Sequence, residues 1–261
     1  MATRAIWKGE LKINSTKLPV KLYSAVEDQS VRFNILDDSG RKRVKQHMVT
    51  RDSGEEVPNE EIKKGYEVEP GKFVILTNED LESLNPKPSR DIKIDEFVSI
   101  EAIPQQYYER PYYLGPDGNQ QDYFALAEAL EKQKLEGIAH WVMRNKSYMG
   151  ALGAQDGYLV LSTLRNSDEV ISAKELPEPA GRPPTTKEIE MAKHLVSLLE
   201  GEFKPSEFKD EYRERVIEFI KKKAKGRAPK LKPVKMKRKT TSLDSVLARS
   251  IAALKKEKRA A

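Results

Sequence analysis

The sequence predicts an α+β fold that is mainly β, followed by a helical region and a basic tail. Two observations predict this order. Short runs with alternating apolar residues, broken by turn residues, extend to about residue 175, and helical spacing begins only after a cluster of prolines. Many short strands at this spacing are typical of a barrel or a sandwich. A third observation, an uneven distribution of charge, sets the tail apart.

The predicted strands are read from local patterns. "GELKINSTKLPVKLYSAV" has alternating apolar positions on both sides of a polar break, and "GYEVEPGKFVIL" is a predicted hairpin that turns at Pro70-Gly71. One helix is expected near Asp122 to Lys134, where apolar residues recur on one side. Further predicted strands are "VRFNIL", "RDIKIDEFVSIEAI" and "GYLVLSTL".

Four prolines between Pro177 and Pro184 predict a stiff linker. A helix follows, with Thr185 and Glu188 as its capping box and Gly201 as its stop. A second helix is predicted to begin at Ser206, with Phe208, Tyr212, Val216 and Phe219 on one face. We therefore expect a core at 1–176, a linker at 177–184, a helical arm at 185–226 and a tail at 227–261.

Charge is divided between an acidic body and a basic tail. From Lys221 onward there are sixteen Lys and Arg against two acids, whereas the residues before it carry 31 bases and 39 acids. Such asymmetry points to an anionic partner, either nucleic acid or a membrane surface, although a solubilising tail is the plain alternative. The candidate phosphate-binding residues of this stretch are Lys221, Lys222, Lys223, Lys225, Arg227, Lys230, Lys232, Lys235, Lys237, Arg238 and Lys239.

The last segment of the tail predicts a short amphipathic helix. Thr241 can begin it, and its apolar stripe has no neighbour in the sequence to cover it, so we expect it to dock on a partner or on the body. The residues of this stripe are Leu243, Val246, Leu247, Ile251 and Leu254.

One basic strip interrupts the acidic body, in "GRKRVKQHMVTR". If this stretch is an extended strand, Arg41, Arg43, Lys45, His47 and Arg51 project from one side. Their spacing of about 7 Å matches the distance between successive phosphates. The strip is thus a candidate for DNA contact, or an edge strand whose cations oppose aggregation.

The sequence offers little for catalysis. There is no Cys, so thiolate metal sites and disulfides are excluded and a reducing, intracellular setting is the default. The three histidines are scattered, and we interpret His140, within "GIAHWVM", as a packed histidine. No nucleophile-elbow or dinucleotide-binding motif occurs. We expect no enzyme, metal or cofactor, and a cytoplasmic, nucleoid-associated protein with neither a spanning segment nor a secretory signal.

Several segments together resemble bacterial Ku, the DNA-end-binding protein of non-homologous end joining. They run from Ala5 to about Gly226, and their order and combination are specific. These segments are "IWKGELKINSTKLPVKLYSAV", "KKGYEVEPGKFVIL", "PYYLGPDGNQQDYFALAEAL", "LVLSTLRNSDEV" and "AKHLVSLLEGEFKPSEFKDEYRERVIEFIKKKAKG".

The resemblance implies a Ku-core-type β-barrel in a homodimeric ring that encloses double-stranded DNA ends without catalysis. It also implies recruitment of the multifunctional ATP-dependent end-joining DNA ligase, by a segment similar to "SLDSVLARSIAALKK", and extra DNA contact by the Lys-rich stretch. The helical arm corresponds to the part of the family that braces the dimer. One position departs from the family pattern, because Ile171 stands where a basic residue usually follows "DEV".

Two rival functions stay open at this point. A sequence-specific transcription regulator would need a helix-turn-helix, for which the two predicted helices joined by "GEFKPSE" are the candidate. A nuclease or nucleotidyltransferase would need a cluster of metal-binding carboxylates.

Overall fold

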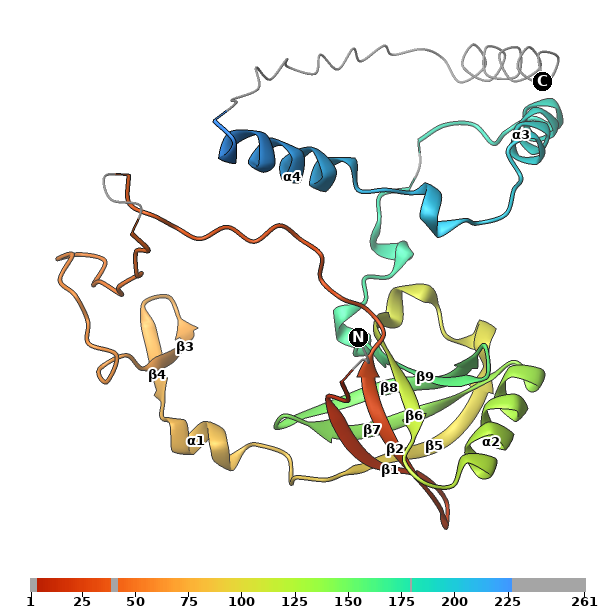
Figure 1. Ribbon diagram of the computed structural model, residues 1–261, viewed down its shortest axis with the longest axis horizontal. Helices are drawn as coiled ribbons and strands as arrows, with labels where there is room; N and C mark the ends of the chain where they lie inside the picture. The colour runs from red at the N-terminus through yellow and green to blue at the C-terminus, as the bar shows by residue number, and fades with distance from the viewer. Residues whose placement is uncertain (1–3, 39–41, 179, 227–261) are drawn as a thin grey trace. The chain divides into compact units, whose positions relative to one another are not determined.

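The computed structural model describes residues 4–38, 42–178 and 180–226. The chain forms two units (Figure 1). The first contains the chain up to Gln29 and from Asn34 to Glu175, and the second contains residues 30–33 and the described chain from Leu176 onward. No helix in these ranges is long and apolar enough to cross a membrane.

The first unit is built on a closed barrel of seven strands, so the expected mainly β barrel is confirmed. Neighbouring strands are antiparallel, except that β1 and β5 are parallel. In their order around the barrel, the strands are β1 (Trp7–Ile13), β2 (Thr16–Ser24), β6 (Tyr108–Pro116), β9 (Tyr158–Leu164), β8 (Lys146–Gln155), β7 (Leu135–Met143) and β5 (Asp91–Ser99).

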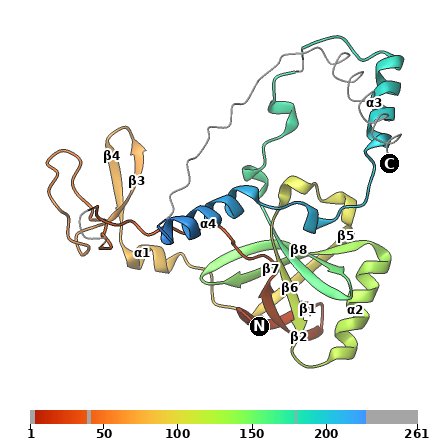
Figure 2. The ribbon, with the colours of Figure 1, turned by 45° about the horizontal axis from the view of Figure 1, so that its top comes forward.

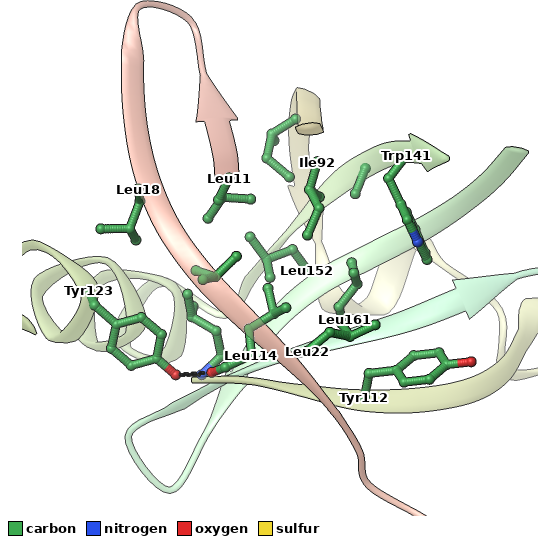
Figure 3. Close-up of a cluster of buried hydrophobic side chains, with 14 of the residues drawn as sticks. Leu11, Leu18, Leu22, Ile92, Tyr112, Leu114, Tyr123, Trp141, Leu152 and Leu161 are labelled. Carbon is green, nitrogen blue, oxygen red and sulfur yellow. Dashed lines mark hydrogen bonds between the residues drawn. The ribbon is translucent and has the colours of Figure 1, made fainter. Parts of the chain in front are cut away.

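Alternating side chains fill the barrel interior. Leu11, Val20, Leu22, Leu114 and Leu161 are fully or almost fully buried and belong to one continuous apolar cluster (Figure 3). Each comes from a strand whose intervening residues face outward, because successive side chains of a strand point to opposite faces. Burial of these side chains is the main free-energy contribution to the barrel.

Helix α2 (Gln120–Gln133) packs against β7, β8 and β9 and closes one end of the barrel interior (Figures 1 and 2). The side chain of Tyr123 is fully buried, its hydroxyl donates to the carbonyl of Leu114, and the N–H of Leu159 donates to that hydroxyl at 2.9 Å. The helix was expected near this position, and its C-cap Lys134 has a left-handed backbone with φ 52°.

The strand directions place every long excursion at the end opposite α2. Strand β2 ends there and β5 begins there, so the 66 residues between Ser24 and Asp91 leave from that end. Strand β9 also ends there, and the C-terminal region continues from it. The β7–β8 turn, at Arg144 and Asn145, lies at the same end.

The excursion between β2 and β5 contains the predicted hairpin, which is confirmed as β3 (Lys64–Glu69) and β4 (Lys72–Leu76). Gly71 turns it with φ 79°, a conformation that glycine adopts without strain. Helix α1 (Asn78–Ser83) follows, with Thr77 and Asp80 as its capping box. By contrast, the strand predicted at "VRFNIL" is wrong.

Apart from an isolated bridge at Leu36, residues 31–36 form no strand. The side chains of Phe33 and Ile35 are 71% and 62% exposed. Their alternation matched a strand, but the segment makes only a short local pairing, in which the N–H of Val44 donates to the carbonyl of Ile35, and it joins neither sheet of the described chain. Strand preference depends on such neighbours.

The second unit carries α3 (Thr186–Leu198) and α4 (Glu211–Ala224). The predicted capping box of α3 is confirmed, since Thr185 and Glu188 bond reciprocally. Arg182 also forks onto the carboxylate of Glu188, with contacts of 2.6 and 2.8 Å, and these donors hold the pKa of Glu188 well below its usual range.

The predicted start of the second helix at Ser206 is wrong. Pro205–Glu207 forms a short 3₁₀ turn, and α4 begins only after Asp210, whose side chain accepts from the N–H of Arg213 at 3.0 Å. Phe208 therefore lies outside the helix. Twelve residues separate α3 from α4, whereas a helix-turn-helix joins its helices by a turn of about 3–4 residues.

Candidate nucleic-acid interface

The outer face of three adjacent barrel strands carries five lysines. Because Leu11, Leu18, Val20 and Leu22 point inward, the residues between them on β1 and β2 point outward. The register places Lys8 opposite Lys21, Lys12 opposite Lys17, and Lys12 beside Lys93. We call Lys8, Lys12, Lys17, Lys21 and Lys93 the lysine face.

Three carboxylates partly neutralise the lysine face. Asp117 contacts Lys21 at 2.5 Å and Lys8 at 3.2 Å, Asp91 contacts Lys12 at 2.7 Å, and Glu10 contacts Lys17 at 3.8 Å. The five lysines outnumber the three acids that contact them, while a fourth acid on the outer side of β5, Asp95, contacts His140, so the face keeps a small positive excess. A duplex that approaches would have to compete with these acids for the ammonium groups.

Asp117 and Asp91 of the lysine face stay charged at neutral pH. The hydrogen bond from Lys21 lowers the pKa of Asp117, and the hydrogen bond from Lys12 lowers the pKa of Asp91. Asp117 in turn raises the pKa of Lys21. A carboxyl with a lowered folded-state pKa adds stability above its ordinary pKa, and this stability is lost as the pH falls through the lowered value.

The basic strip at residues 41–51 is not the extended strand that the sequence predicts. Two local pairings replace it, with bridges between Leu36 and Arg43 and between Val49 and Glu56. Arg51 lies in the turn of the second pairing, so the series with period two is broken. The physical reason is that each half of the strip finds its backbone partners within a few residues.

The cations of the strip nevertheless remain at the surface. Arg43, Lys45 and Arg51 are exposed, and His47 contacts the carboxylate of Glu56 through Nδ1. Arg41 lies outside the described residues. The structure therefore leaves these side chains accessible to phosphate but does not align them in one row.

The C-terminal turn of α4 gathers a second group of cations. Lys221, Lys222 and Lys223 lie in its last turn, and Lys225 is its C-cap. Acids occupy the first turn at Glu211 and Glu214, so charge along the helix complements the helix dipole at both ends. Lys222 pairs with Glu218. The predicted DNA-binding residues from Arg227 to Lys239 and the stripe from Leu243 to Leu254 lie outside the described residues.

Within the described ranges, no group of three or more His, Asp or Glu residues could hold a metal ion. The interpretation of His140 as a packed histidine is wrong. Its neighbours Ala139 and Trp141 point into the barrel, so His140 points outward, where Nδ1 lies 2.6 Å from Asp95. Its side chain is 52% exposed.

The lysine face was missed by the sequence analysis, although the sequence contains its signal. Lys8 and Lys12 alternate out of phase with Leu11, and Lys17 and Lys21 alternate out of phase with Val20. Lys93 could not be added to them from the sequence, because the parallel pairing of β1 with β5 is not visible in either segment.

Two cation–aromatic pairs were missed as well. The guanidinium of Arg110 lies 5.6 Å from the ring centre of Tyr112, and the ammonium of Lys146 lies 5.3 Å from that of Tyr148. Both pairs lie at the end of the barrel opposite α2. Alternating cationic and aromatic residues are their signal in the sequence.

A closed barrel with an outward lysine face, an exposed basic excursion and a cationic helix end has the features of a β-barrel protein that binds nucleic acid through its phosphates. The chain belongs to the Ku family. The family model described as the Ku70/Ku80 beta-barrel domain matches residues 12–191.

Curated relatives support this assignment over most of the chain. A protein of Anaeromyxobacter sp. (strain K) named non-homologous end joining protein Ku is 38% identical over 258 residues, covering 97% of this chain and 86% of the relative. Ku 2 of Geotalea uraniireducens is 38% identical over 226 residues, with 87% and 88% covered. The non-homologous end joining protein Ku of Archaeoglobus fulgidus is 36% identical over 226 residues, covering 86% of this chain and 89% of the relative.

Replacing Asp117 by Asn tests the lysine face. The change removes the acid that engages both Lys8 and Lys21, so we expect affinity for duplex DNA of random sequence to rise about threefold at low salt, the modest effect expected of an exposed ion pair. Fluorescence anisotropy measures the dissociation constant. Asp156→Asn, in the exposed β8–β9 turn, is the matched control. Equal affinity for D117N, D156N and the unaltered chain would remove the lysine face from the interface.

Proposed function

We propose that the chain binds the ends of double-stranded DNA in non-homologous end joining, as a ring of two copies and without catalysing a reaction. The observation that carries the proposal is the lysine face, whose outward direction is set by the same strand alternation that builds the barrel core. Membership of the Ku family and the names of the relatives support it.

Lysines on a rigid sheet suit contact with phosphates and not the reading of bases. They provide point charges at positions fixed by the strand register, and phosphate contacts orient a duplex without recognising its sequence. Because three acids already occupy part of this face, affinity for an open surface would be modest. Enclosure by a ring compensates for this, since a threaded duplex cannot leave sideways.

The enclosed-end proposal predicts a preference for linear DNA. A duplex of about 40 base pairs should compete at least tenfold better than the same mass of closed circular plasmid, because only the linear form offers ends. Competition against a labelled linear duplex measures this ratio. The same plasmid cut once at any site is the control and should gain competitive strength. Equal competition by circular and cut plasmid would contradict threading from an end.

Exposed apolar side chains of the second unit support the homodimer. Ile189, Val196 and Leu199 of the α3 region are 42%, 70% and 65% exposed, and with Ala192 they line an open hollow of about 1030 Å³. Phe203 and Phe208 stack at 5.5 Å yet remain largely exposed. Exposed apolar groups of this kind mark a protein interface, and we assign them to contact with a second copy of the chain.

Val196→Asp should weaken the dimer. It places a charge on the apolar side of α3, and desolvating that charge in an interface is unfavourable by several kcal/mol. Light scattering, with and without a short duplex, should give the mass of a dimer for the unaltered chain and of a single chain for V196D. His194→Asp adds the same charge away from the hollow and should remain dimeric. A single chain for the unaltered protein, even at high concentration and with DNA, would remove the ring.

Two further roles are proposed for the C-terminal region. The cations from Lys221 to Lys239 would hold DNA beside the ring, and the stripe Leu243, Val246, Leu247, Ile251 and Leu254 would contact the ATP-dependent end-joining ligase. The cationic last turn of α4 supports the first role, because it begins this run on an ordered helix. The second role rests on the apolar spacing of the segment and on the resemblance of its sequence.

Two truncations separate these roles. A chain that ends at Gly226 should show a flatter salt dependence of DNA binding, by roughly 5 log units per log unit of salt if the tail neutralises about six phosphates. A chain that ends at Thr240 should keep the steep dependence but lose stimulation of the ligase. If the salt dependence of DNA binding is unchanged in the chain that ends at Gly226, the tail serves only solubility. If the chain that ends at Thr240 still stimulates the ligase fully, the terminal apolar stripe does not contact the ligase.

A further inference from the structure

The barrel wall has a gap at the end opposite α2. Strand β1 pairs with β2 from Trp7 onward, but its pairing with β5 begins only at Glu10. Strand β7 pairs with β8 as far as Met143, but its pairing with β5 stops at Trp141. Because β5 begins at Asp91, no strand lies between β1 and β7 at this end, and only the non-strand residues Pro88, Ser89 and Arg90, which lead into β5, line the seam there.

Backbone groups of β1 face this gap. The N–H of Glu10 donates to the carbonyl of Arg90 at 2.8 Å, across the seam. Alternate residues of a strand direct their N–H and C=O to the same side, so the backbone of Lys8 faces the seam too, ahead of the first residue pair of the β1–β5 ladder. This alternation ends at Ile6, whose N–H donates to the carbonyl of Leu22 on β2 at 2.8 Å. An added strand could therefore continue the ladder.

A hollow of about 650 Å³ occupies the gap, and we call it the barrel mouth. Its apolar lining comes from Ala5, Ile6 and Trp7 before and at the start of β1, from Val142 and Met143 of β7, and from Pro88 in the segment that leads into β5, where Ser89 also lines it. Its rim carries Lys8, Arg90 and Arg144, with no Asp or Glu among the lining residues. The nearest acid along β5, Asp91, is already paired with Lys12 on the outer face.

The two arginines of the mouth are available to a ligand. Among the described residues, no carboxylate forms an ion pair with Arg90 or Arg144, whereas Lys8 contacts Asp117. Arg144 also has φ 53°, a left-handed backbone that glycine or asparagine adopts more readily. The conformation of the hairpin turn does not favour arginine at this position, so we attribute the presence of its guanidinium at the rim to ligand binding.

The width of the gap selects the kind of occupant. Two strands that flank one missing strand lie about 9.6 Å apart, which admits one extended chain and not a duplex. This chain's own C-terminal tail, with sixteen bases and two acids from Lys221 onward, would be repelled by the cationic rim. The occupant must therefore be extended, acidic and partly apolar.

We propose that the barrel mouth binds an acidic peptide segment of another protein by strand addition. The segment pairs with the free edge of β1 at Lys8, places apolar side chains against Trp7 and Met143, and directs carboxylates to Arg90 and Arg144. Main-chain pairing supplies affinity in this mode, and the alternating side chains supply specificity. This site shares Lys8 with the lysine face, but Lys12, Lys17, Lys21 and Lys93 do not line the mouth.

Titration of the full chain with two short peptides tests this proposal. The acidic probe is acetyl-Asp-Val-Asp-Val-Asp-amide, and the basic probe replaces each Asp by Lys. Of the two tryptophans in the chain, Trp7 lines the mouth, so bound peptide should change the tryptophan emission. Anisotropy of the fluorescein-labelled probes measures the affinity. We expect only the acidic probe to bind.

Variants distinguish the mouth from other surfaces. Arg90→Glu and Arg144→Glu should each weaken the acidic probe roughly tenfold or more, as expected when a charge-assisted hydrogen bond is lost. Lys134→Glu, at the exposed C-cap of α2 and outside both the lysine face and the mouth, should bind the acidic probe like the unaltered chain. Arg144→Gly removes the charge and relieves the left-handed backbone, so it should weaken the probe while raising the melting temperature. That pair of results excludes misfolding as the cause.

Three results would overturn the proposal. The first is no binding of the acidic probe, and the second is equal binding of that probe to the Lys134→Glu and Arg144→Glu variants. The third is a single-stranded oligothymidylate that binds as tightly as the acidic probe, with the same sensitivity to Arg144, because the mouth would then belong to a nucleic-acid site. Duplex end binding should be unchanged in Arg144→Gly.

Discussion

Closure of the barrel is the constraint on which the other features depend. Each of the seven strands must pair on both sides, and this is possible only if one face of every strand can be packed in a dry interior. Leu11, Val20 and Leu22 meet that requirement for β1 and β2. Because Lys8, Lys12, Lys17 and Lys21 alternate with these buried residues, their side chains must point outward. The packing of the core therefore determines the position of the charged surface.

The two ends of the barrel have different roles. At one end α2 inserts Tyr123, whose hydroxyl satisfies a strand carbonyl and a strand N–H that would otherwise be buried without partners. At the other end the chain departs twice, and the wall stays open beside the start of β5. The closed end is thus sealed by a buried, fully bonded tyrosine, whereas the open end carries the barrel mouth.

Much of the barrel could be predicted from the sequence, but not its closure. Local alternation identified the strands around Leu11, Val20 and Ile92, and the Pro70-Gly71 turn identified the hairpin. Strands β7 and β8 were harder to recognise because glycines occupy core positions. A Cβ on Gly150 would lie 2.7 Å from the ring of Trp141, so the indole of Trp141 packs in the space that glycine leaves open on the neighbouring strand. Such complementarity between distant residues is invisible in either segment alone.

The candidate site was predicted less well than the fold. The basic strip from Arg41 to Arg51 matched a strand by period, but periodicity does not provide a neighbouring strand, and the segment pairs with itself. His140 was misplaced for a related reason. Its sequence neighbours Ala139 and Trp141 both point into the barrel, and the residue between two inward residues of a strand must point outward. The alternation of side chains along a strand determines which side of the sheet a residue faces, whereas the apolar composition of its sequence neighbours does not.

The parallel pairing of β1 with β5 has a consequence for biosynthesis. The first strand emerges from the ribosome long before Asp91, its second neighbour, so the nascent β1–β2 hairpin must wait with one edge unpaired while the intervening excursion is made. Unpaired edges invite association between chains, and lysines beside them discourage it. The cations that we assign to the mature protein's ligand would thus first protect the growing polypeptide.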